Sequence, residues 1–130
     1  MDGILLFAHG ARDPAWAQPF QKVETGLRAA RPGLAVRLAY LEFMSPSVAE
    51  AAGQLVEAGC RQIQVVPLFL GTGGHVRRDL PMLLEQLRVQ HGPRVSWHLQ
   101  PPIGEAAAVI DAMIEVCIAA VSNTGSLETP

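Results

Sequence analysis

The chain is poor in cysteine, in aromatic residues and in net charge, and each shortage excludes a class of protein. Its 130 residues include 2 Cys and 5% aromatics, and 10 Lys+Arg face 12 Asp+Glu. Cys60 and Cys117 stand far apart among apolar residues, which excludes a disulfide scaffold and predicts small core side chains in a reducing compartment. The absence of a basic block argues against a nucleic-acid partner.

Long hydrophobic runs are also missing, although 49% of the residues are hydrophobic. No run approaches the roughly 18 residues that a membrane span needs, and the first residues lack the cationic segment of a signal peptide. We therefore expect a cytoplasmic protein without a membrane partner. This length is typical of one domain with a sizeable core. We predict a single domain over residues 1–121 and a frayed polar tail over 122–130.

The hydrophobic pattern alternates between strand-like and helix-like periods. Buried strands are expected at 3–8 and 63–70, and alternating strands at 34–40 and 95–99, each followed by a stretch of helical spacing. Asp13-Pro14 and Ser45-Pro46 are typical helix starts. Strict alternation of strands and helices predicts an α/β fold in which helices cover both faces of a mostly parallel sheet.

The composition of the strands predicts their order. The strands at 3–8 and 63–70 are continuous apolar runs, as expected at the centre of a parallel sheet, and the other two carry polar residues typical of edges. The expected fold is thus a four-stranded, mostly parallel sheet of order 2-1-3-4. Right-handed crossovers then place helices one and four on one face and helices two and three on the other. In sheets of this kind, ligands bind beyond the carboxyl ends of the strands at the point where the strand order reverses. Here that switch point falls between strands one and three.

Three residues with useful chemistry follow strands at this switch point. His9 ends the first strand, His75 follows the third, and Glu42 follows the second, which neighbours the first. Two imidazoles and a carboxylate can bind a transition metal and move protons near neutral pH. Gly73 and Gly74 would let a large ligand approach the backbone closely. The pattern therefore indicates a metal site that also handles protons.

Simpler interpretations stand beside this one. A histidine at a strand end is commonly a surface residue, and Glu42 fits a solvated loop acid equally well. The glycine-rich segment 71–74 matches neither the dinucleotide fingerprint nor the Walker A pattern. The remaining charged or titratable candidates are surface arginines, a histidine at a helix C-terminus and a histidine facing outward from an edge strand, namely Arg12, Arg77, Arg78, His91 and His98.

Three segments resemble a known family. Residues 6–14 (LFAHGARDP), 40–47 (YLEFMSPS) and 66–81 (VPLFLGTGGHVRRDLP) are similar to the class II chelatases, in the short single-domain form of the CbiX/SirB-like sirohydrochlorin cobaltochelatases and ferrochelatases. The resemblance covers about residues 3–104, and GGHV-x-x-DLP is its most specific part. One position departs from the family's His-Gly-Ser-Arg: Ala11 replaces the serine, which removes a hydroxyl contact to the substrate.

The resemblance implies insertion of Co²⁺ or Fe²⁺ into sirohydrochlorin without ATP, in cobalamin or siroheme biosynthesis. The divalent metal, with Ni²⁺ as a further option, would be a substrate, and no tightly bound cofactor is expected. The family's active-site histidines fall on His9 and His75, and its acidic residue on Glu42. Because larger members use two such domains, a homodimer is expected.

The residues around the switch point suit this reaction. His9 and His75 would bind metal and accept pyrrole protons, while Glu42 would hold incoming metal. We expect two arginines to bind the carboxylates of the substrate, two residues to form an apolar lip beside it and two glycines to let it approach the backbone. These residues are Arg12 and Arg77, Phe43 and Leu70, and Gly73 and Gly74. Two alternatives remain: a non-catalytic carrier of tetrapyrrole or metal, and a flavodoxin-like domain that binds a phosphate or nucleotide.

Overall fold

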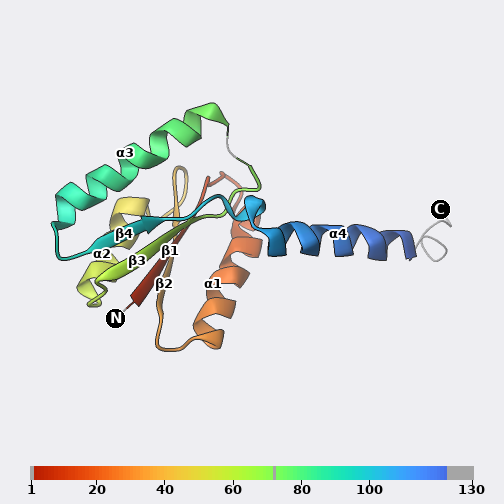
Figure 1. Cartoon of the computed structure of the whole chain (residues 1–130), viewed down its shortest axis with the longest axis horizontal. Helices are drawn as coiled ribbons and strands as arrows, with labels where there is room; N and C mark the ends of the chain where they lie inside the picture. Colours follow the sequence, from red (N-terminus) through yellow and green to blue (C-terminus); the bar gives the residue numbers. More distant parts are fainter. Residues whose placement is uncertain (1, 72, 123–130) are drawn as a thin grey trace.

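Four strands form one parallel sheet of order β2-β1-β3-β4, as the sequence predicts. The computed structural model describes residues 2–71 and 73–122, and Figure 1 shows its arrangement. The strands are β1 (Asp2–Ala8), β2 (Ala35–Tyr40), β3 (Gln62–Pro67) and β4 (Ser96–Leu99). The helices are α1 (Gln18–Ala30), α2 (Val48–Glu57), α3 (Gly74–His91) and α4 (Ala107–Ser122), with short 3-10 helices η1 (Pro14–Ala17) and η2 (Ile103–Glu105).

One helical segment begins at Asp13-Pro14, as the sequence predicts, whereas α2 is capped by Ser47, two residues after the predicted start at Ser45. The Asp13 carboxylate accepts a hydrogen bond of 3.0 Å from the Ala15 N–H, and Pro14 opens η1, which leads into α1. Ser47 and Glu50 form a reciprocal capping box at the start of α2. The hydrogen bonds that the Glu50 carboxylate receives lower its pKa. Local side-chain chemistry therefore starts both segments.

The core lies on both faces of the sheet, because side chains of β1 alternate between them. Leu5 and Phe7 pack into the layer under α2 and α3, whereas Leu6 and Ala8 pack into the smaller layer under α1. All four side chains are buried. A strand that is buried on both sides belongs at the centre of the sheet, where the continuous apolar run at 3–8 predicts it.

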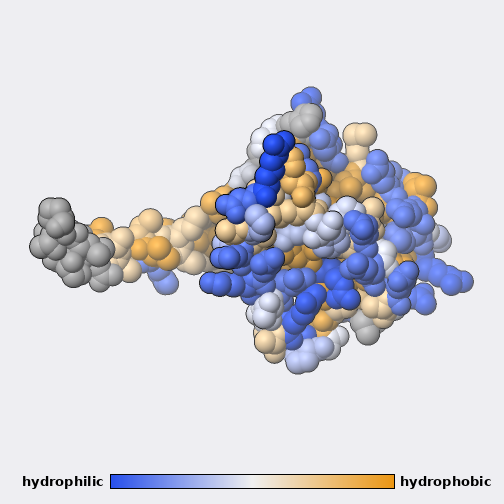
Figure 2. All heavy atoms as spheres, turned by 180° about the vertical axis from the view of Figure 1, so that it is seen from behind, coloured by the Kyte–Doolittle hydropathy of each residue, from blue (hydrophilic) through white to orange (hydrophobic). Residues whose placement is uncertain are grey.

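The placement of α4 corrects one expectation. Instead of packing beside α1, α4 projects away from the sheet (Figure 1) and has no buried residue. Beyond β1 the sheet is polar on the α1 side: His98 Nε2 lies 2.9 Å from Gln62 Oε1, and Gln100 donates to Gln64 at 2.6 Å. The segment before α4 is anchored elsewhere, since the Gly104 N–H in η2 donates to the Phe69 carbonyl, and α4 extends outward from this anchor (Figure 2). The outward position of His98 on the edge strand is confirmed.

As a result, the two cysteines lie in different environments, one buried and one exposed. Cys60 is buried, and burial raises the pKa of its thiol, so it is the small core side chain that the sequence predicts. The same expectation is wrong for Cys117, which is exposed on α4. Ser122, the first residue of the predicted tail, belongs to α4, and residues 123–130 lie outside the described part. None of the helices in residues 2–71 and 73–122 is long and apolar enough to cross a membrane.

The segment after β3 also differs from expectation. The strand ends at Pro67, three residues earlier than predicted, because the Phe69 carbonyl accepts the Gly104 N–H (2.9 Å) in place of a strand partner. Helix α3 begins at Gly74, so His75 lies in the first turn of a helix and not in a glycine-flanked loop. The helix runs on to His91, which confirms that residue at its C-terminus.

Candidate functional site

The loops after β1 and β2 are joined by backbone hydrogen bonds. The Leu41 N–H donates to the Ala8 carbonyl and the Glu42 N–H to the His9 carbonyl, both at 3.0 Å. Between them Gly10 has φ +97°, and a Cβ at this position would lie 1.8 Å from the Glu42 carbonyl oxygen. Only glycine fits here. The structure thereby brings the predicted pair His9 and Glu42 next to each other.

An aromatic residue holds the exposed ring of His9. The imidazole stacks on Phe69, with ring centroids 4.3 Å apart and an angle of 23° between the planes. Phe69 is 4% exposed and packs edge-on against Phe7 at 5.4 Å. It therefore connects His9 to the core and limits how the imidazole can turn. Sequence reasoning missed Phe69, because the strand expected at 63–70 concealed the turn at Pro67 that brings its ring under His9.

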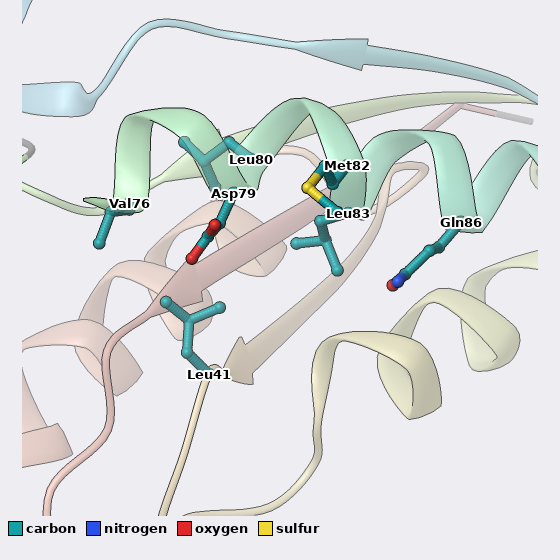
Figure 3. Close-up of a pocket in the computed structure, with 7 residues that line it drawn as sticks. All are labelled: Leu41, Val76, Asp79, Leu80, Met82, Leu83 and Gln86. Atoms are coloured by element: carbon teal, nitrogen blue, oxygen red, sulfur yellow. The ribbon is translucent and has the colours of Figure 1, made fainter. Parts of the chain in front are cut away.

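A groove of about 350 Å³ lies between α3 and the loop after β2. In Figure 3, Leu41 points up from that loop toward the side chains of α3, and the lining residues are Leu41, Val76, Asp79, Leu80, Met82, Leu83 and Gln86. Leu41 directly precedes Glu42, and Val76 directly follows His75. The turn that carries His75 and the loop that carries Glu42 thus border one groove. The side chain of His75 lies outside what the structure describes.

The predicted substrate-binding arginines line two other grooves. The Arg12 guanidinium sits 5.1 Å from the centre of the Phe43 ring, and both residues line a second groove of about 310 Å³. Arg77 lines a third groove of about 470 Å³, formed by α3 with the segment after β4. The two cations therefore occupy separate grooves at the same end of the sheet. Arg78 instead bonds the Gly74 carbonyl at 3.3 Å, at the exposed start of its own helix.

The apolar lip that the sequence predicts is exposed. Phe43 is 59% exposed and Leu70 is 70% exposed. Phe43 has φ 66°, a backbone region that an aromatic residue rarely adopts, and such strain is concentrated at functional sites. Gly73 and Gly74 are also exposed, Gly73 as the residue that caps α3 and Gly74 as its first residue. These residues leave an open apolar surface that a flat ligand can cover.

The short helix η2 is packed against the loop that carries Leu70. Gly104 is buried in η2, and a Cβ there would lie 2.0 Å from the Leu70 carbonyl oxygen. Its N–H bonds the Phe69 carbonyl, so η2 holds both the ring support of His9 and the lip residue Leu70. Sequence analysis gave Gly104 no role, because contact between residues this far apart is not visible in a local pattern.

The polar groups that the structure describes do not form a complete metal site by themselves. Among side chains in the described part, no three of His, Cys, Asp and Glu are grouped closely enough to hold a metal ion. His9 and Glu42 are in contact through their backbones. Burial and the charge of Glu24 raise the pKa of the Tyr40 phenol at the end of β2.

A parallel sheet of order β2-β1-β3-β4 with histidine-bearing segments after β1 and β3 defines a chelatase-type α/β protein. The CbiX family model matches residues 3–120. This chain belongs to the CbiX family. The assignment confirms the resemblance that the three sequence segments indicate.

Relatives and solved structures agree with this assignment. A sirohydrochlorin cobaltochelatase from Saccharolobus islandicus is 34% identical over 109 residues, which are 80% of this chain and 84% of that protein. The crystal structure of a CbiX protein of cobalamin (vitamin B12) biosynthesis from Marinobacter aquaeolei superposes with a TM-score of 0.82 at 32% identity, covering 95% of this chain and 99% of that one. The sirohydrochlorin chelatase SirB from Bacillus subtilis, in complex with cobalt, has a TM-score of 0.75 at 25% identity, covering 88% of this chain but 48% of that one.

Proposed function

We propose that this chain is a metal chelatase that inserts Co²⁺ or Fe²⁺ into sirohydrochlorin without ATP. The observation that carries the proposal is the groove bordered by the His75 turn and the Glu42 loop. The Glu42 N–H donates to the carbonyl of His9, whose imidazole stacks on Phe69. Relatives are named sirohydrochlorin cobaltochelatase, and SirB structures contain cobalt or Fe³⁺. The product would enter cobalamin or siroheme biosynthesis.

The reaction exchanges two pyrrole protons for one divalent metal, so it needs metal ligands and proton acceptors. His75 would bind the metal and accept a proton, since it starts α3 at the border of the groove. His9 would present the second imidazole from across the site. Glu42, fixed by its backbone bond to His9, would hold the incoming metal before insertion. The metal is a substrate in this scheme, and no resident cofactor is required.

Substrate binding would use surfaces outside this groove. Sirohydrochlorin is a polycarboxylate, and Arg12 and Arg77 offer one cation in each of the two other grooves. Phe43 and Leu70 would cover the apolar face of the macrocycle. Gly73 and Gly74 would let its edge approach the backbone at the start of α3.

The working form would be a homodimer in the cytoplasm. SirB chains are about twice as long, since this chain covers 48% and 45% of two of them. A second copy would therefore supply the half that a single copy lacks. Both cysteines are free thiols, as is usual in a reducing compartment.

Turnover distinguishes the enzyme from the carrier. Sirohydrochlorin in about hundredfold excess over the chain is mixed anaerobically with Co²⁺, Fe²⁺ or Ni²⁺, and visible absorption is followed with and without protein. We expect many product molecules per chain, at a rate well above spontaneous insertion. A colour change that stops at one equivalent identifies a carrier and contradicts the proposal.

Arg12 supplies a test of substrate binding. We expect Arg12→Ala to raise the KM for sirohydrochlorin about 10-fold with little change in kcat, because the charge contacts a carboxylate remote from the reacting nitrogens. Steady-state kinetics at saturating metal measure the effect. Arg61→Ala is the matched control, since Arg61 precedes β3 at the opposite end of the sheet. A KM unchanged in Arg12→Ala removes Arg12 from the substrate contacts.

A further inference from the structure

The imidazole of His9 is held by an aromatic ring. Its plane lies 23° from that of the Phe69 ring, and the two centroids are 4.3 Å apart. Among the residues that the structure describes, none forms a hydrogen bond with either ring nitrogen of His9. A histidine that binds a metal is usually oriented by a hydrogen bond from its second nitrogen to a carboxylate or a carbonyl. Of the contacts that the structure describes, the stack is the one that can orient this imidazole.

The support beneath the imidazole is itself fixed. The Phe69 ring packs edge-on against Phe7, at 87° and 5.4 Å, and Phe7 is fully buried. The Phe69 carbonyl accepts the Gly104 N–H at 2.9 Å, so its backbone is tied to η2. Because Phe69 is 4% exposed, it has almost no surface left for a ligand. Any effect of Phe69 on the reaction must therefore pass through His9.

The stack determines the directions from which His9 can be used. A metal ion or a proton binds a ring nitrogen along its lone pair, which lies in the plane of the imidazole. A contact that fixes this plane therefore fixes the directions of both possible bonds. The stack uses the face of the ring and leaves both nitrogens at its edge available, whereas a hydrogen bond to a carboxylate would occupy one of them. Since His9 is exposed, water can reach the ring.

We propose that Phe69 is the positioning residue for His9 in metal insertion. Its ring fixes the plane of the imidazole, so that one nitrogen serves the metal or a pyrrole proton while the other exchanges its proton with water. In the proton step the pyrrole N–H bond breaks, its electron pair stays on the pyrrole nitrogen, and the proton bonds to one nitrogen of His9. The imidazolium then gives the proton of its other nitrogen to water and becomes neutral again. The inference rests on the proposed function and deepens it.

A simpler role for Phe69 would be to fill the core. That role requires an apolar side chain of suitable volume, whereas positioning requires a flat ring under the imidazole. Leucine keeps apolar volume at this place and offers no flat surface. The two roles therefore differ in what Phe69→Leu does to the reaction once its effect on stability has been matched by a control.

The kinetics of Phe69→Leu give the first test. We expect kcat for cobalt insertion to fall about 10-fold, as when a group that orients a ligand histidine is removed. The KM for sirohydrochlorin is expected to stay within about twofold of the parent, since Phe69 touches no substrate. Phe20→Leu is the matched control, because it removes a ring from the pair with Trp16 (4.7 Å) in the layer on the opposite face of the sheet. Its kcat is expected to match the parent.

A double variant separates positioning from packing. In a His9→Ala background, Phe69→Leu is expected to lower kcat no further, because the ring that it positions is already gone. A residue that only fills the core would cost activity in both backgrounds. Circular dichroism and thermal denaturation check that each variant is folded.

NMR of the histidine rings and binding of Co²⁺ add readouts that do not depend on turnover. The ring current of Phe69 shifts the carbon-bound ring protons of His9 upfield, and their signals are identified by their loss in His9→Ala. This shift is expected to vanish in Phe69→Leu and to persist in Phe69→Tyr, which keeps a ring and the larger part of kcat. In a Co²⁺ titration without tetrapyrrole, Phe69→Leu is expected to raise the dissociation constant about 10-fold.

The outcomes separate this inference from the proposed function. If Phe69→Leu loses the shift but keeps kcat and Co²⁺ affinity, the inference is overturned and metal insertion is untouched. Equal losses of kcat in the two backgrounds, or in Phe69→Leu and Phe20→Leu, mean that Phe69 only fills the core, which also overturns the inference. A parent chain without turnover contradicts the proposed enzyme. The Co²⁺ titration then decides the role of Phe69: weaker binding in Phe69→Leu supports it and equal binding overturns it.

Discussion

Replacing His75 by alanine is expected to lower metal insertion about 100-fold or more, the usual contribution of a positioned acid–base group. The substitution removes a metal ligand and a proton acceptor together. The fold is expected to survive, because His75 lies in the first turn of α3 and alanine is the best helix former. Initial rates of cobalt insertion, corrected for the spontaneous reaction, measure the effect, and circular dichroism checks the fold.

Two further histidine variants serve as a control and as a comparison for His75→Ala. His98→Ala is the control, since His98 is exposed on the edge strand β4, and its turnover is expected to match the parent. His9→Ala is expected to lose activity to a smaller degree, because one imidazole still holds the metal. If His75→Ala is folded and inserts cobalt at the parent rate, the assignment of His75 and the mechanism built on it are wrong.

Gly10→Ala is expected to damage both stability and activity. The added Cβ would lie 1.8 Å from the Glu42 carbonyl oxygen, and φ +97° is unfavourable for alanine, so the loops after β1 and β2 must separate. We expect a loss of about 2–4 kcal/mol in the free energy of unfolding and at least a 10-fold loss of turnover. Urea denaturation followed by tryptophan fluorescence measures the stability.

A second glycine provides the matched control for this variant. Gly26 lies in the exposed middle of α1, and a Cβ there would meet nothing within 4 Å. Gly26→Ala is therefore expected to raise the free energy of unfolding by up to about 1 kcal/mol, because alanine loses less conformational entropy in a helix. Equal losses in the two variants would mean that the close approach at Gly10 has no special role.

Local patterns predicted most of the fold because its determinants are local. The apolar run of β1 and the helix start at Asp13 are encoded within a few neighbouring residues, and the structure confirms them. The predicted start of α2 at Ser45 is two residues early, because Ser47 and Glu50 form the capping box. The strand order follows from the same patterns, since continuous apolar runs predict central strands. The three motif segments predicted the family, and the family model confirms it.

The candidate site was predicted only in part. The proximity of His9 and Glu42 is confirmed by a backbone hydrogen bond, because strand order alone places their loops side by side. The stack of His9 on Phe69 and the contact of Gly104 with Leu70 were missed, since each joins residues far apart in the sequence. The helical position of His75 was also missed, because the glycines before it resemble a longer loop.

The sequence by itself determined the alternation of strands and helices, the order of the sheet and the candidate residues of the site. Each of these depends on side-chain polarity and on spacing along the chain, which tertiary contacts do not change. Only the tertiary structure decided where α4 goes and which group supports the His9 ring. Helical spacing makes α4 a helix, but it leaves the packing partner open. In the structure η2 is anchored to the segment after β3, and α4 leads from it away from its own sheet.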